Sequence, residues 1–218
     1  MSGAVTELLE APGPRPRPGL PLPLRRAAEL LALMAVPTAL GLVVRNADAR
    51  PVATVLFHYS PDRFVQGRVW TLPLSGLVPP KLTNLGPNTI AMTIILVPYV
   101  LLRGAWRTVG RFFAGHVLAT LAVAVLVLPG AAVGWQFASD VARAPDFGVS
   151  AGLAAIAGAM VVVVWRRRGR VAGVVVLVAV FGFFASRLLV TGSLSHYLSE
   201  SEHVVAALTG ICLEGALA

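Results

Sequence analysis

The sequence predicts an all-α membrane protein in which six helices cross the bilayer. Hydrophobic residues make up 56% of the 218 residues and charged residues only 13%. The mean hydropathy is +0.78. A soluble domain of this size needs far more polar surface to cover its core. In addition, the apolar residues gather in blocks close to the ~20 residues that a helix needs to cross ~30 Å of hydrocarbon.

Six such blocks follow one another along the chain. They cover residues 28–44, 82–102, 112–135, 147–165, 171–190 and 203–218. The last block is short, so it either thins the bilayer locally or begins a few residues earlier. Between the first two blocks, residues 45–85 mix aromatic and polar side chains, which is typical of a long external loop laid partly into the interface.

The chain divides into two parts. Residues 1–26 form a tail rich in proline and arginine that cannot fold alone, and residues 27–218 form the six-helix membrane domain. The block at 28–44 admits two interpretations, a signal peptide cleaved near residues 47–49 or a retained first helix. The tail before it is long for a signal peptide, which favours the retained helix.

The arginines predict the orientation. They cluster in the tail, at 103–111 and at 166–170, whereas the other short loops carry acidic residues. The positive-inside rule therefore places the protein in the cell membrane with both termini in the cytoplasm. The formal net charge is +8, but the arginines lie between apolar blocks and not along one face, so we expect no nucleic-acid partner. Arg187, near the outer end of its helix, is expected to snorkel.

Ser150 and His203 are the candidate catalytic residues. Each begins a membrane helix on the outer side, and they are 53 residues apart. Ser150, Ala154 and Gly158 form a stripe of small residues at helical spacing. A second stripe consists of His203, Ala206 and Gly210. Small stripes let membrane helices approach closely, so we expect the serine and histidine to meet at the top of a helix–helix seam. A serine hydroxyl paired with an imidazole is sufficient apparatus for acyl transfer.

These residues resemble the rhomboid family of intramembrane serine proteases. Gly148-Val149-Ser150-Ala151-Gly152 is similar to the family's Gly-x-Ser-Gly segment, and the stretch from His203 to Gly210 is similar to its His-x-x-Gly-x-x-x-Gly segment. The resemblance covers roughly residues 28–218. It implies a six-helix rhomboid-like bundle with Ser150 as nucleophile and His203 as general base. The implied substrate is a transmembrane segment of another membrane protein, and no cofactor or metal is implied.

The chain departs from the family pattern at several positions. Ala151 and Ala206 stand where the family has glycines, and the second helix lacks the family's His-x-x-x-Asn pair. Asn88 is the nearest candidate for an oxyanion donor, with Asn84 as another. Arg68-Val69-Trp70 is similar to the family's Trp-Arg pair in the first outer loop.

Two other functions remain open from the sequence. The first is a catalytically inactive rhomboid-like protein that binds client membrane helices, and the second is a small transporter or channel subunit. Ser150 and His203 would then be helix caps or packing residues. His116 is interpreted as a packing residue or as a hydrogen-bond partner of a neighbouring helix, and Glu214 is expected to snorkel from the inner end of the last helix.

Overall fold

The computed structural model describes residues 22–45, 50–78, 85–144, 149–190 and 194–216, and this part of the chain is almost entirely helical. The predicted tail up to residue 21, the segment 46–49 with the possible cleavage site, and Asn84 lie outside the described residues. The helices are α1 (Leu22–Arg45), α2 (Arg50–Phe57), α3 (Pro61–Val65), α4 (Thr71–Ser75), α5 (Leu85–Arg103), α6 (Ala105–Ala132), α7 (Gln136–Arg143), α8 (Ser150–Arg168), α9 (Arg170–Val190) and α10 (Leu194–Ala216).

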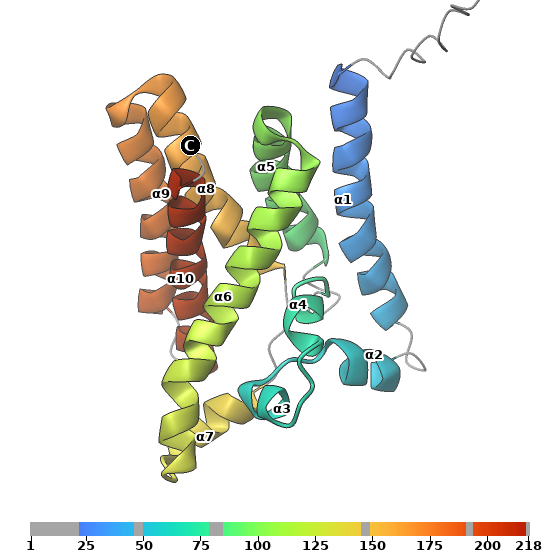
Figure 1. Ribbon diagram of the computed structural model, residues 1–218, viewed down its shortest axis with the longest axis vertical. Helices are drawn as coiled ribbons and strands as arrows, with labels where there is room; N and C mark the ends of the chain where they lie inside the picture. The colour runs from blue at the N-terminus through green and yellow to red at the C-terminus, as the bar shows by residue number, and fades with distance from the viewer. Residues whose placement is uncertain (1–21, 46–49, 79–84, 145–148, 191–193, 217–218) are drawn as a thin grey trace, which may run out of the picture.

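The six long helices form an upright bundle, in which α1 stands at one side and α9 at the other (Figure 1). The short helices α2, α3, α4 and α7 lie toward one end of the bundle. At the opposite end lie the start of α1, the turn between α5 and α6, the turn between α8 and α9, and the end of α10. Within the predicted loop at 45–85, the described residues 50–78 contain three short helices, α2, α3 and α4.

Four helices in the described part of the chain are long and apolar enough to cross a membrane, which makes this an all-α membrane protein. They cover Leu24–Val43, Ala105–Ala132, Ser150–Arg168 and Arg170–Arg187. The sequence prediction counted six spans. Of the two other long helices, α5 contains a shorter apolar stretch, Thr89–Arg103, and α10 carries three glutamates.

Several helices begin earlier than predicted. The last helix starts at Leu194 and not at 203, which agrees with the second of the two expectations for its short block. Helix α1 starts at Leu22, so Arg25 and Arg26 belong to its first turns and not to the tail. Pro23 is compatible with this start, because a proline is tolerated in the first turn of a helix.

The arginine-rich connections are much shorter than the sequence suggested. Helix α6 begins at Ala105, so Arg107 and Arg111 are helical and only Gly104 separates α5 from α6. Gly169 alone separates α8 from α9. Both glycines have positive φ angles, of 88° and 90°, a conformation that side-chain-bearing residues rarely adopt. One glycine is thus sufficient to reverse the chain direction at each place.

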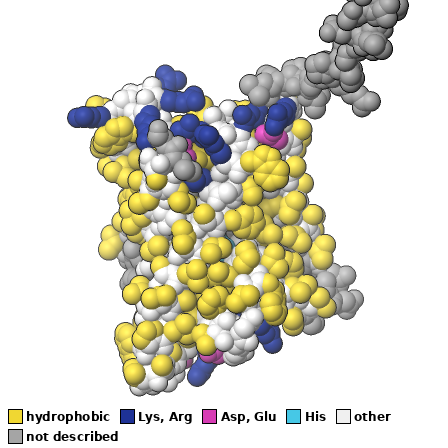
Figure 2. Space-filling view, viewed as in Figure 1, with side chains coloured by type: hydrophobic (Ala, Val, Ile, Leu, Met, Phe, Trp, Pro, Cys, Tyr) yellow, Lys and Arg dark blue, Asp and Glu magenta, His cyan; other side chains and the backbone are white. Residues whose placement is uncertain are grey.

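Helix α8 lies at the centre of the bundle and is the most buried of the four spanning helices. Its Leu153, Ile156 and Val163 pack with α5 and with Phe112 of α6 in one apolar cluster. On another face its alanines pack against α10 and against Phe184 of α9. In the view of Figure 2 apolar side chains cover the middle of the bundle, and Lys and Arg side chains gather mainly at the end where α1 and α9 begin. We refer to this end as the arginine-rich end.

Candidate active site at the α8–α10 seam

The two stripes of small residues pack against each other as predicted. A side-chain carbon added at Gly158 of α8 would collide with the carbonyl oxygen of Ala207 in α10. One added at Gly210 of α10 would collide with the carbonyl oxygen of Ala155 in α8. The backbones of the two helices are therefore in direct contact, which only glycine permits at these positions. Ala206 and Ala207 are completely buried in the seam.

The seam aligns the two helices in parallel. Ala155 and Gly158 face the segment from Ala207 to Gly210, and further along α8 the guanidinium of Arg166 donates to the carbonyl oxygen of Gly215 over 3.2 Å. The residue numbers differ by 55 for the Ala155–Gly210 contact and by 49 for the Gly158–Ala207 contact. Ser150 precedes Ala155 by five residues and His203 precedes Ala207 by four, so both residues lie on the same side of this close contact between the helices.

Ser150 is the first residue of α8, and its side chain is exposed. Helix α8 has Val149 at its N-cap and no side-chain capping bond, so Ser150 does not act as the cap. Among the hydrogen bonds of the described residues, none joins Ser150 to His203. The residues before this helix, including Asp146 and Gly148, lie outside the described residues.

His203 is buried on α10 and is fixed by two contacts. Its Nδ1 lies 3.0 Å from Oε2 of Glu200, and its ring stacks on Phe184 of α9 with 5.3 Å between ring centroids and 28° between planes. A carboxylate only accepts hydrogen bonds, so Nδ1 carries the proton and donates it to Glu200. In the neutral imidazole, Nε2 then keeps a free lone pair, which is the form that a general base requires.

Glu200 is itself held by a second partner. Its Oε1 accepts from Nε of Arg187 on α9 over 3.2 Å, and the glutamate side chain is only 4% exposed. This chain of contacts was not expected, because Glu200 precedes residue 203, at which the last helix was predicted to begin. Glu200 and His203 are three residues apart, and residues at this spacing are neighbours on the surface of a helix. A predicted helix that began before Glu200 would therefore have indicated the pair.

The predicted oxyanion donors are only partly located. Asn88 lies in the first turn of α5, while its side chain is among those that the structure does not describe. The backbone N–H groups at the start of α8 are the alternative donors, since the first turn of a helix offers N–H groups that have no carbonyl partner within the helix. Trp70, in the segment compared with the rhomboid first loop, is 46% exposed.

His116 belongs to a different environment. It is 1% exposed on α6, and its Nε2 lies 3.0 Å from both Oγ of Ser75 and the carbonyl oxygen of Leu72 in α4. The predicted hydrogen bond to a neighbouring helix is therefore present, and it anchors α4 inside the bundle. Ser75 is fully buried as well, so this serine–histidine pair is closed to a substrate.

Glu214 does not snorkel, contrary to the prediction. Its side chain is 4% exposed, and it lies at the arginine-rich end of α10 against two arginines and a tyrosine. Arg103 of α5 and Arg111 of α6 both form ion pairs with it, the latter at 3.3 Å. The hydroxyl of Tyr99 donates to the same carboxylate over 2.7 Å. Glu214 thus connects α10 with α5 and α6. These contacts join residues far apart in the sequence, so they could not be predicted from Glu214 alone.

Comparison with known proteins adds no family assignment: the chain matches no family model, no curated protein sequence and no solved structure.

Proposed function

We propose that this chain is a rhomboid-like intramembrane serine protease that cleaves transmembrane segments of other membrane proteins. The observation that carries the proposal is the contact of Nδ1 of His203 with Glu200, which orients the imidazole on the helix that packs directly against α8, the helix that Ser150 begins. A histidine that only fills space requires no such orientation. The resemblance of both segments to rhomboid motifs supports the same function.

In the proposed reaction, His203 removes the Ser150 proton through Nε2 as the serine oxygen attacks a substrate carbonyl carbon. The N–H groups at the start of α8, with Asn88 as a further donor, stabilise the negative oxygen that forms. His203 then gives its proton to the departing amine, which leaves an acyl group on Ser150. Water, deprotonated by His203, releases this acyl group as a carboxylic acid.

The proposal also includes the six-span topology with both termini in the cytoplasm. Helix α10 is central in the bundle, and its glutamates at 200 and 214 are paired with arginines, which lowers the cost of placing them in a membrane. The gathering of arginines at one end supports the assignment of that end to the cytoplasm.

The test is covalent labelling of the detergent-purified protein with a fluorophosphonate probe for activated serines. We expect Ser150→Ala to abolish labelling and His203→Ala to slow it by about 10²-fold or more. Ser186→Ala is the matched control, because Ser186 is exposed on the neighbouring helix and bonds only to its own helix backbone. Equal labelling of all four proteins would overturn the protease proposal.

A second function is an inactive rhomboid-like protein that binds client helices. The observation that favours it is the absence of a hydrogen bond between Ser150 and His203 among the described residues. In this case the unmodified protein would show only background labelling, whereas a client helix would copurify equally well with the unmodified protein and with Ser150→Ala.

A further inference from the structure

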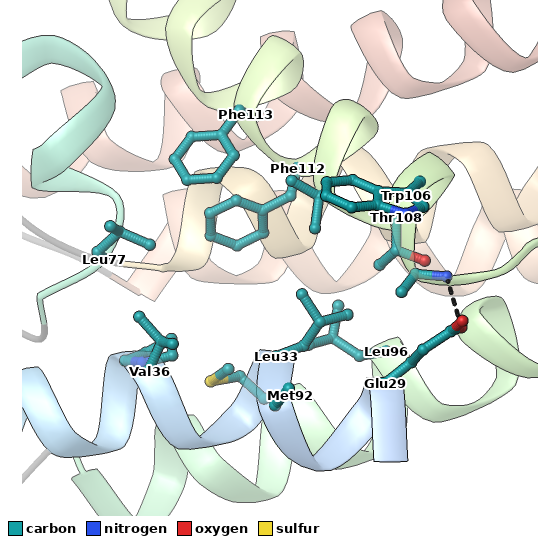
Figure 3. Close-up of a pocket in the computed structure, with 14 residues that line it drawn as sticks. Glu29, Leu33, Val36, Leu77, Met92, Leu96, Trp106, Thr108, Phe112 and Phe113 are labelled. Atoms are coloured by element: carbon teal, nitrogen blue, oxygen red, sulfur yellow. Dashed lines mark hydrogen bonds between the residues drawn. The ribbon is translucent and has the colours of Figure 1, made fainter. Parts of the chain in front are cut away.

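An apolar cavity of about 440 Å³ lies between α1, α5 and α6. Leu33 and Val36 of α1 line one side, and Phe112 and Phe113 of α6 face them across the cavity, with Met92 and Leu96 of α5 nearby (Figure 3). Nearly all of the lining side chains are apolar, and such a cavity does not hold water. It is at the opposite side of the bundle from α9 and its contacts with His203, so it is separate from the proposed active site.

The size of the cavity limits its occupant. Its volume is in the range of 300–1,000 Å³ that is typical of pockets for small ligands. A transmembrane helix is about 10–12 Å wide and about 30 Å long, so it is far too large to enter. The α1 residues that line the cavity run from Glu29 to Pro37, which corresponds to roughly 12 Å of helix. A narrow cavity of this length and lining suits a single hydrocarbon chain.

One mouth of the cavity lies at the arginine-rich end. Glu29 forms this mouth, and its carboxylate accepts from Nε of Arg25 over 2.9 Å and from the backbone N–H of Ala105 over 3.3 Å. Arg26 lies 3.9 Å from the same carboxylate. The two arginines therefore outnumber the one glutamate and leave a net positive charge. Although it is bonded to Glu29, the side chain of Arg25 is 64% exposed, so it is accessible to a ligand.

Trp106 adds a further feature of a lipid contact. It lines the cavity, although 82% of its surface is exposed. An exposed tryptophan beside an arginine-rich end is typical of a residue at the membrane interface. Basic pockets between membrane helices on the cytoplasmic side are a recurring site for anionic lipid headgroups.

We propose that the α1–α5–α6 cavity binds one acyl chain of an anionic phospholipid, whose phosphate contacts Arg25 and Arg26. The apolar lining accommodates the chain and the positive mouth selects the headgroup. Each arginine near an anionic lipid surface strengthens binding by about fivefold. This site is independent of the proposed protease activity, and its test does not require that activity.

The experiment uses the full chain in phosphatidylcholine vesicles that contain a trace of phosphatidylglycerol with a photoreactive group in one acyl chain. Photoreactive phosphatidylcholine serves as the second probe. After irradiation, mass spectrometry identifies the labelled residues. We expect the phosphatidylglycerol probe to label the α1 and α6 residues of the cavity at least fivefold more than the phosphatidylcholine probe.

Two matched pairs of variants test the two parts of the site. Ala32→Trp fills the cavity and should remove this labelling, whereas Ala35→Trp, an exposed position of α1 outside the cavity, should leave it unchanged. Arg25→Gln should reduce labelling by phosphatidylglycerol about fivefold, whereas Arg167→Gln, an exposed arginine at the end of α8, should not.

Three results would overturn the proposal. They are equal labelling by the two lipids, labelling that survives Ala32→Trp, and loss of labelling when an apolar transmembrane peptide is added in excess. The last result would assign the cavity to a client helix.

Discussion

Helix α10 carries buried glutamates near both of its ends, and Glu214 and Glu200 have different partners. Glu214 at the arginine-rich end is surrounded by Arg103, Arg111 and Tyr99, which bind both of its oxygens. Glu200 at the other end divides its oxygens between the half-exposed Arg187 and the imidazole of His203. Both side chains are equally buried, at 4% exposure.

The partners explain the difference. The two cations beside Glu214 come from α5 and α6, so their pairing with Glu214 fixes three helices. Glu200 orients a histidine whose other ring nitrogen remains available. Glu214 therefore stabilises the packing of the helices at one end of α10, whereas Glu200 orients a candidate general base near the other end.

Removing the glutamate at the arginine-rich end should have the largest effect. Glu214→Ala leaves two arginines uncompensated in a buried position, which typically costs about 3–5 kcal/mol in the free energy of unfolding. Thermal unfolding in detergent micelles measures the loss. Arg166→Ala removes an exposed arginine that contacts the same part of α10, and it should change stability by less than about 0.5 kcal/mol. Similar losses in both variants would contradict the role given to Glu214.

Replacing glycines of the α8–α10 seam by alanine should lower the free energy of unfolding by an intermediate amount. The same replacement at a glycine outside the seam should not lower it. Gly158→Ala and Gly210→Ala each place a methyl group against a backbone carbonyl, which should destabilise the protein by about 1–3 kcal/mol. Gly182→Ala on α9 meets no atom within 4 Å and should leave stability unchanged or raise it by about 0.5–1 kcal/mol. If all three alanines act alike in the unfolding measurement, the α8–α10 seam is not as close as described.

Changing the glutamate beside His203 should affect activity more than stability. Glu200→Gln offers an amide that can donate to Nδ1 and favour the wrong tautomer, so fluorophosphonate labelling should slow by about tenfold or more. Asp140→Asn is the control, since the exposed carboxylate of Asp140 accepts from Gln136 on its own helix α7. Equal labelling rates for the two variants would leave Glu200 without an orienting role.

The smallest effect is expected at Arg187. Its side chain is 52% exposed, and an ion pair with so much solvent contact contributes about 0–1 kcal/mol. Arg187→Gln should therefore slow labelling no more than about fivefold. If Arg187→Gln slowed labelling as much as Glu200→Gln does, the arginine, and not the glutamate, would set the orientation of His203.

The sequence predicted the long helices well because apolar blocks of about 20 residues are a strong signal. It placed their ends less well. Arg107 and Arg111 suggested a loop, but both lie within α6. Arg107 is exposed near the end of the helix, whereas Arg111 is buried and paired with Glu214, so charge alone does not end a helix. Single glycines, Gly104 and Gly169, mark the true turns.

The candidate site was predicted only in outline. The close contact of α8 with α10 followed from two stripes of small residues, which are local patterns. Glu200 was missed because its helix begins nine residues before the predicted start. The Glu214 cluster was missed for another reason, since Tyr99, Arg103 and Arg111 lie more than 100 residues away in the chain and pair only in the folded bundle.

The order of synthesis gives the α8–α10 seam a further consequence. Helix α8 is made about 50 residues before the part of α10 that covers it, which at about 5–20 residues per second corresponds to a delay of roughly 3 to 10 s. During this interval α9 has been made, but the glycine–alanine face of α8 still has no α10 against it. Lipid, neighbouring helices or the insertion machinery must cover this face until α10 arrives. Substitutions at Gly158 would therefore act on late assembly in the membrane and leave the insertion of α8 itself unaffected.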